Sequence, residues 1–156
     1  MVSLSVVVCF AALAVATATN VQQCAGYNFP DLKENIQLSP CKRTPCKLKK
    51  NTDENITIQF TPTADLSDVK NKVTGEVFSI PLPFPGVDGA SICDKLFTED
   101  GSKTSCPVKA GTKYLYKDSF PILSIYPAID VKVRWELQDP DNSVISCFEV
   151  PAKIIA

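Results

Sequence analysis

The sequence predicts an all-β protein, an immunoglobulin-like antiparallel β-sandwich with three disulfides. Three observations predict it: a strictly alternating apolar run at 129–138, six cysteines in the expected mature chain, and no long window with a helical apolar period. Short β-rich runs with turn residues about every ten positions are typical of two packed sheets. Helices should be no longer than a turn or two.

Residues 1–18 have the pattern of a secretory signal peptide, which leaves 19–156 as a single domain. An apolar stretch from Val6 to Ala16 overlaps the small residues that suit cleavage after Ala18, with Ala16 as the alternative. A membrane anchor is the weaker interpretation, because the stretch is shorter than the roughly 20 residues that span a bilayer. We therefore expect a secreted protein.

Six cysteines remain after cleavage, and an even number in an oxidising compartment predicts three disulfides. They are Cys24, Cys41, Cys46, Cys93, Cys106 and Cys147. Fifteen pairings are possible. Spacing favours closing the short 41–46 turn and the polar 93–106 loop, which leaves the first and last cysteines to join the two ends of the domain. A zinc site is disfavoured, because the chain has no CxxC pair and no histidine.

The expected strands follow from alternation along the chain. They cover 36–38, 56–60, 73–80 with an interruption at Gly75, 114–116, and a hairpin of 129–138 and 144–150 around the turn at 139–143. Apolar and polar residues alternate strictly from Ile129 to Gln138, which is typical of a half-buried strand. One face of this hairpin needs a second layer to cover it.

Two apolar segments rich in proline, 80–85 and 120–127, do not fit ordinary central strands. Proline cannot donate a ladder hydrogen bond, so 81–85 should lie at a sheet edge. The segments could simply fill the core. Alternatively, they form a rigid rim around an apolar pocket between the two sheets.

Composition argues against an enzyme and against nucleic-acid binding. Without histidine there is no Ser-His-Asp triad and no imidazole base, and no cofactor motif is present. A net charge of −1 exerts no general attraction for nucleic acid.

A local basic cluster, Lys42, Arg43, Lys47, Lys49 and Lys50, is either a solvated loop or a patch that docks transiently on anionic membranes. Asn55 begins a glycosylation sequon and should be exposed.

Several motifs together carry a resemblance to the ML lipid-recognition family of soluble sterol carriers, which includes mite group-two allergens. They are the cysteine spacing, Pro45-Cys46-x-Leu48, the run Val77 to Pro85, Cys106-Pro107-Val108, Tyr114-x-Tyr116, Tyr126-Pro127, Trp135 to Asp139 and Cys147 to Pro151. The resemblance spans nearly the whole expected mature chain. It implies a two-sheet sandwich with a lipid pocket, no catalysis and no cofactor.

The resemblance also implies specific site residues and partners. It pairs Cys24 with Cys147, Cys41 with Cys46 and Cys93 with Cys106, and it places ligand-binding residues at Leu82, Phe84, Phe120, Ile122, Tyr126, Pro127 and Trp135. Of these, Phe84, Ile122 and Tyr126 should lie at the mouth. The expected function is a monomeric carrier, extracellular or in the lysosomal lumen, that binds a sterol or similar lipid and transfers it to a membrane or to an acceptor such as a membrane sterol transporter. Alternatives are an innate-immunity lipid-recognition module and a carrier of fatty acids or semiochemicals.

Overall fold

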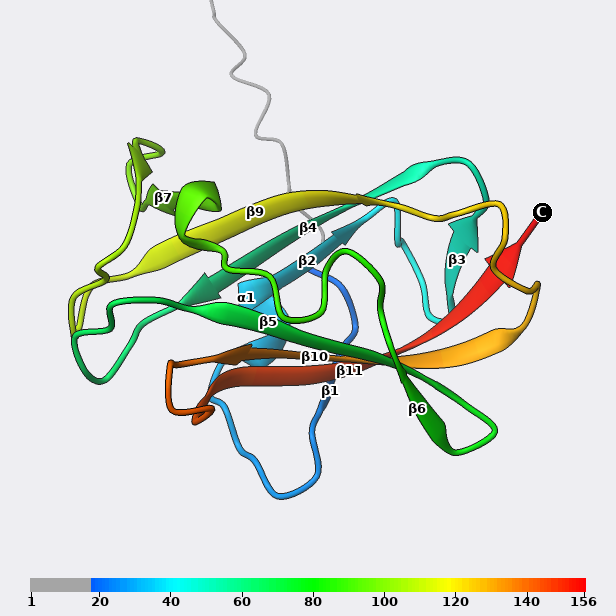
Figure 1. Cartoon of the computed structure of the whole chain (residues 1–156), viewed down its shortest axis with the longest axis horizontal. Helices are drawn as coiled ribbons and strands as arrows, with labels where there is room; N and C mark the ends of the chain where they lie inside the picture. Colours follow the sequence, from blue (N-terminus) through cyan, green and yellow to red (C-terminus); the bar gives the residue numbers. More distant parts are fainter. Residues whose placement is uncertain (1–17) are drawn as a thin grey trace, which may run out of the picture.

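Two β-sheets pack face to face in the computed structural model, which describes residues 18–156 (Figure 1). The first sheet has the order β1 (Gln22–Gln23), β11 (Val144–Ile155), β10 (Asp130–Gln138), β5 (Lys70–Val77) and β6 (Ile80–Pro83), with β3 (Cys46–Lys49) added beside β11. The second has the order β2 (Ile36–Ser39), β4 (Asp53–Phe60), β9 (Tyr114–Pro121), β7 (Leu96–Thr98) and β8 (Lys103–Thr104). Helix is limited to α1 (Leu32–Asn35) and a 3₁₀ turn, Cys93–Lys95, within these residues. The predicted signal peptide lies almost wholly outside them.

The predicted C-terminal hairpin forms the centre of the first sheet. β10 pairs with β11 in antiparallel register, with Trp135 opposite Phe148, and a bulge lies between Leu137 and Gln138. β11 continues to Ile155, beyond the predicted end, because its last residues pair in parallel with β3. The hairpin is thus longer than predicted and is covered by the second sheet.

The predicted strand at 73–80 is wrong in its bounds, because this segment contains two strands. β5 and β6 pair as a hairpin around Phe78 and Ser79, whose φ angles are 50° and 64°. Left-handed backbone at both positions matches the twist of a two-residue hairpin turn. β6 is the edge strand, which confirms the position predicted for its prolines.

Two further expectations are corrected in the second sheet. The polar 93–106 loop contains β7 and β8, and β7 adds to β9. β9 extends to Pro121, because Lys117, Asp118 and Ser119 pair with Thr57, Ile56 and Asn55 of β4 despite their polarity. Asn55 is exposed as predicted.

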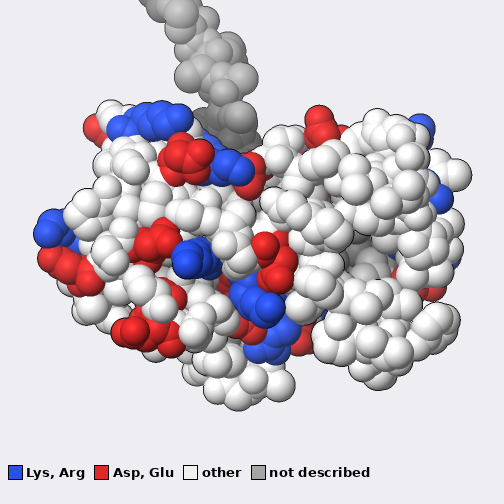
Figure 2. All heavy atoms as spheres, in the orientation of Figure 1, with Lys and Arg blue, Asp and Glu red and all other residues white. Residues whose placement is uncertain are grey.

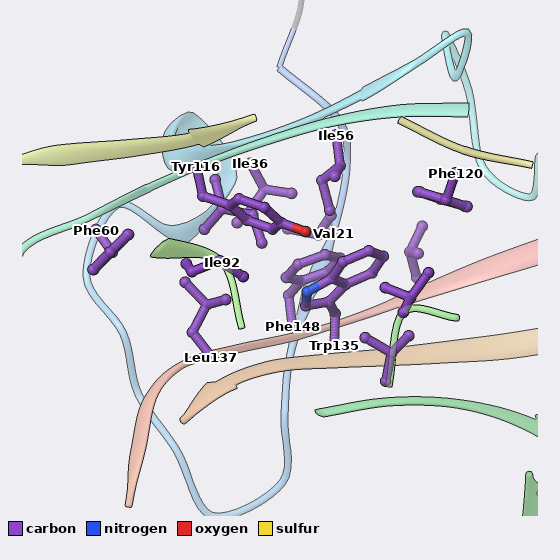
Figure 3. Packing of buried hydrophobic residues seen from close by; sticks show 14 of the residues in the cluster. Val21, Ile36, Ile56, Phe60, Ile92, Tyr116, Phe120, Trp135, Leu137 and Phe148 are labelled. Carbon is purple, nitrogen blue, oxygen red and sulfur yellow. The ribbon is translucent and has the colours of Figure 1, made fainter. Parts of the chain in front are cut away.

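The core between the sheets is built on aromatic side chains. Trp135 and Phe148 stack with ring centroids 6.4 Å apart, and Tyr116 and Phe120 approach them from the second sheet (Figure 3). All four are at least nine-tenths buried. Burying such side chains supplies about 1.5–3 kcal/mol each, so these rings are a main source of stability.

Disulfides join Cys24 to Cys147, Cys41 to Cys46 and Cys93 to Cys106, as spacing favoured. The first closes a loop of 123 residues. On the chain-entropy account it stabilises most, by about 4–5 kcal/mol. Among the described residues, none of the helices has the length and apolarity needed to cross a membrane.

Candidate ligand-binding site

Two adjoining apolar hollows lie against the first sheet, at the end of the sandwich that carries β6 and the 121–129 loop. The inner cavity, of about 30 Å³, is lined from both sheets, including Val73, Phe120, Trp135 and Phe148. The outer groove, of about 330 Å³, lies between β6 and the 121–129 loop and includes Val77, Leu82 and Tyr126. In Figure 2 this end is hollowed and nearly free of charge, whereas charged side chains gather over the other half of the face.

Phe84 separates the two hollows. It lines both, together with Leu48 and Val133. Its ring lies 5.5 Å from that of Phe120 and 5.7 Å from that of Tyr126, edge-on in both cases. Its backbone is held by a hydrogen bond from its N–H to the carbonyl of Val73, 2.9 Å long. Phe84, Leu48 and Val133 thus form the boundary between the cavity and the groove.

The volumes of the two hollows limit the size of ligand that each can hold. Small-molecule pockets usually measure about 300–1,000 Å³, so the outer groove reaches this range and the inner cavity does not. The inner cavity has room for a water molecule or two. A ligand of sterol size would therefore fill the groove and enter the inner cavity only by displacing Phe84 and its neighbours.

A buried hydrogen-bond chain fixes Trp135 behind the inner cavity. Its indole N–H donates to Asn71 Oδ1 at 2.9 Å, and Asn71 Nδ2 donates to the Tyr116 hydroxyl at 2.8 Å. That hydroxyl donates to Asp118, which also pairs with Lys95 at 2.9 Å. Burial raises the pKa of Tyr116, so its hydroxyl stays protonated and the chain intact. The ring is thus a rigid wall.

Glu54 is the one ionisable side chain that lines the inner cavity. It is 2% exposed, and burial raises its pKa from 4.5 to about 7. Sequence analysis did not predict Glu54 as a site residue, although the alternation along its strand points to it. Ile56, Ile58 and Phe60 alternate along β4, and the same period extended back two residues reaches Glu54.

The structure brings six of the seven predicted ligand-binding residues to the hollows. Leu82, Phe84, Tyr126 and Pro127 line the groove, and Phe84, Phe120 and Trp135 line the inner cavity. The Tyr126 hydroxyl is buried without a hydrogen-bond partner in the described part of the chain. Contact of these residues with a ligand stays a prediction.

Ile122 is the exception, and its predicted place at the mouth is corrected. It is 1% exposed and lines neither hollow. Its N–H donates a hydrogen bond to the Thr52 carbonyl, and its carbonyl accepts one from the Asn51 N–H. These two hydrogen bonds hold Ile122 against the second sheet. Ile122 is therefore a core residue that fixes the loop.

Apolar tips project on both sides of the groove. Phe78, at the turn between β5 and β6, is 90% exposed, and Ile125, in the facing loop, is 81% exposed. Ile80, Leu82 and Leu123 are also at least one-third exposed. Exposed apolar clusters of this kind mark surfaces that contact membranes or other proteins.

The basic cluster lies close to this end. Lys50 N–H bonds to the Ile155 carbonyl, and the next residue, Asn51, bonds to Ile122 in the loop beside the groove. None of the five basic side chains forms an ion pair within residues 18–156. The cluster therefore presents uncompensated positive charge, and its docking role stays a prediction.

Comparison with known proteins identifies the family. The ML domain family matches residues 18–154. The chain is 32% identical over 154 residues to NPC intracellular cholesterol transporter 2 homolog a of Drosophila melanogaster, covering 99% of each. It is 30% identical to mite group 2 allergen Tyr p 2 of Tyrophagus putrescentiae, over 90% of this chain and 92% of the allergen.

A solved structure agrees with the sequence relatives. The crystal structure of a Niemann-Pick type C2 protein from Japanese carpenter ant matches with a TM-score of 0.67 and 27% identity, covering 77% of this chain and 89% of the ant protein. The resemblance inferred from the motifs, to the ML lipid-recognition family with its soluble sterol carriers and mite group-two allergens, is thereby confirmed. The chain belongs to the ML domain family.

Proposed function

We propose that this protein is a carrier that takes a sterol or a similarly sized apolar lipid between its two sheets and transfers it to a membrane or an acceptor protein. The observation that carries the proposal is the outer groove, which is lined almost entirely by apolar side chains and is separated from the inner cavity by the ring of Phe84. The cholesterol-transporter names of its relatives point to the same ligand class. The protein acts outside the cell or in the lysosomal lumen.

Binding works by desolvation, and no bond is made or broken. A sterol that buries about 400 Å² of apolar surface gains roughly 10 kcal/mol at 25 cal/mol per Å². Association entropy and the movement of Phe84 oppose this by several kcal/mol, so a micromolar or tighter affinity results.

Titration of a fluorescent sterol tests this function. Tyr126→Ala removes a ring that lines the outer groove and would pack on the ligand, so affinity should fall about tenfold or more. Phe78→Ala is the matched control, because this phenylalanine is 90% exposed at the turn and lines neither hollow. Fatty acid and lipopolysaccharide titrated in parallel separate the alternative ligands. A folded wild type that binds none of them contradicts the carrier function.

Docking on membranes follows from the surface around the groove. The apolar tips enter the lipid interface while Lys49 and Lys50 meet anionic head groups, at roughly 1 kcal/mol per charge. Transfer to vesicles should therefore accelerate with anionic lipid and slow with salt. Reversing both lysines to glutamate should slow transfer without changing sterol affinity. Equal transfer to neutral and anionic vesicles would show that the cluster is an ordinary solvated loop.

A further inference from the structure

Glu54 has no polar partner among residues 18–156. Its side chain forms no hydrogen bond and no ion pair with any described residue, although it is 2% exposed. Its neighbours Asp53 and Asn55 are exposed on the opposite face of β4, and Glu54 lies opposite Phe120 in the register. Strand geometry therefore fixes the carboxyl on the cavity side.

The other buried glutamate, Glu136, has the hydrogen-bond partners that a structural carboxylate usually has. Glu136 is 8% exposed, and it accepts hydrogen bonds from Arg134 and Gln138, both at 2.7 Å. Buried polar groups are almost always paired in this way, because an unpaired one loses its hydration without compensation. Glu54 has no such partner among residues 18–156, and its carboxyl is not fully sealed either, because only the Tyr126 hydroxyl is both completely buried and unpaired there. The residual exposure lies on a side chain that lines the inner cavity.

No other charge compensates Glu54 from the elements packed around it. On β3 and β10 the charged residues alternate with the residues that line the cavity, so they lie on the outer face of the sheet. They are Lys47, Lys49, Lys132 and Arg134. The same holds on β5 and β11 for Lys72, Glu76, Glu149 and Lys153. β2 carries no charged residue, and on the segment after β6 Asp88 accepts bonds from Lys72 and from the N–H of Val73.

One carboxylate does share the inward face of the second sheet. Asp118 precedes Phe120 by two residues on β9 and lies opposite Ile56. It is already paired with Lys95 and with the Tyr116 hydroxyl, so it is not free to share a proton with Glu54 or to bind a ligand. The remaining lining is apolar apart from the Cys41–Cys46 disulfide, which does not titrate.

Resting on the proposed function, we propose that Glu54 binds the polar head of the lipid and selects a hydroxyl head over a carboxylate. An alcohol donates a hydrogen bond to the ionised side chain, and the protonated side chain can donate to the alcohol oxygen. A carboxylate head cannot donate, and it places a second negative charge in an apolar cavity. The apolar remainder of the lipid then extends past Phe84 into the outer groove.

The experiment compares hexadecanol with hexadecanoate in displacing a fluorescent probe from the wild type, Glu54→Gln and Glu54→Leu. The measured quantity is the ratio of hexadecanol affinity to hexadecanoate affinity. Near pH 8 this ratio should be about ten times larger in the wild type than in Glu54→Gln. Near pH 6 this extra preference should shrink, because the side chain gains a proton. Glu54→Gln should show no such change between the two pH values. Glu54→Leu should weaken alcohol binding while leaving the acid unaffected or tighter.

Asp53→Asn is the matched control, because it removes a charge from the outer face of the same strand. It should bind like the wild type. An alcohol-to-acid ratio that is the same in wild type, Glu54→Gln and Glu54→Leu would overturn the selectivity proposal while leaving the carrier function intact. A wild type that binds neither probe nor sterol would overturn the carrier function itself, and melting curves of each variant separate both results from misfolding.

Discussion

Replacing Glu54 by glutamine should change how the stability of the empty protein depends on pH. Burial raises the pKa of Glu54 from its ordinary value of 4.5 to about 7. Because the folded pKa exceeds the unfolded one, the folded state holds the proton more tightly, and ionisation opposes folding. Wild-type stability is therefore lost as the pH rises from about 4.5 through 7, and the whole penalty is present above that range.

The magnitude follows from the same two values. At about 1.4 kcal/mol per pH unit, the penalty reaches roughly 3 kcal/mol near pH 8. Glutamine keeps the shape and never ionises, so its own unsatisfied amide lowers stability equally at every pH. The difference in unfolding free energy between Glu54→Gln and wild type should thus shift in favour of the variant by roughly 3 kcal/mol between about pH 4 and pH 8. For a domain of this size, that is about 10 °C in melting temperature.

Urea unfolding at a series of pH values, with disulfides intact, measures this difference. Asp53→Asn controls for the loss of one negative charge on the same strand, and its stability relative to wild type should change little over this pH range. If the difference in unfolding free energy between Glu54→Gln and wild type does not change with pH, Glu54 titrates as it does in water and its pKa is not raised by burial.

Three further predictions concern the walls and the surface. Trp135→Phe leaves Asn71 Oδ1 without its donor, and urea unfolding should show a loss of roughly 1–3 kcal/mol, whereas full retention would mean that the hydrogen-bond chain is dispensable. Gly75→Ala places a methyl group 3.0 Å from Val131 Cγ2 in the groove, so sterol titration should show weaker uptake, and unchanged uptake would place the ligand elsewhere. Intact-mass analysis of protein secreted by a eukaryotic host should show cleavage near Ala18, a glycan on exposed Asn55 and no reactive thiol; a free thiol in the native protein would contradict the disulfide assignment.

Local patterns predicted much of the fold. The alternation from Ile129 to Gln138 and the turn at 139–143 predicted β10 and the start of β11, because one face of that hairpin is buried. Cysteine spacing favoured the three disulfides that form. The parallel pairing of β3 with β11 could not be read in this way, since it joins residues about a hundred positions apart that share no local pattern.

The candidate site was predicted less completely, for physical reasons. The proline-rich segments indicated a rim, and Phe84 and Tyr126 do line the groove. Ile122 was misplaced because two backbone hydrogen bonds, invisible in an apolar pattern, draw it into the core. Glu54 was missed because a glutamate at the start of a strand resembles a solvated turn residue. Only the inward period of β4 reveals its burial.

Native mass spectrometry of the protein purified from a eukaryotic host shows whether each chain carries a lipid. We expect a single lipid of sterol size per chain, retained when the protein is transferred gently to the gas phase and replaced when excess sterol is supplied. Tyr126→Ala should lose most of this bound mass, and Phe78→Ala should keep it. A folded protein that carries no lipid and takes up no sterol would contradict the claim that the space between the sheets is a lipid-binding site.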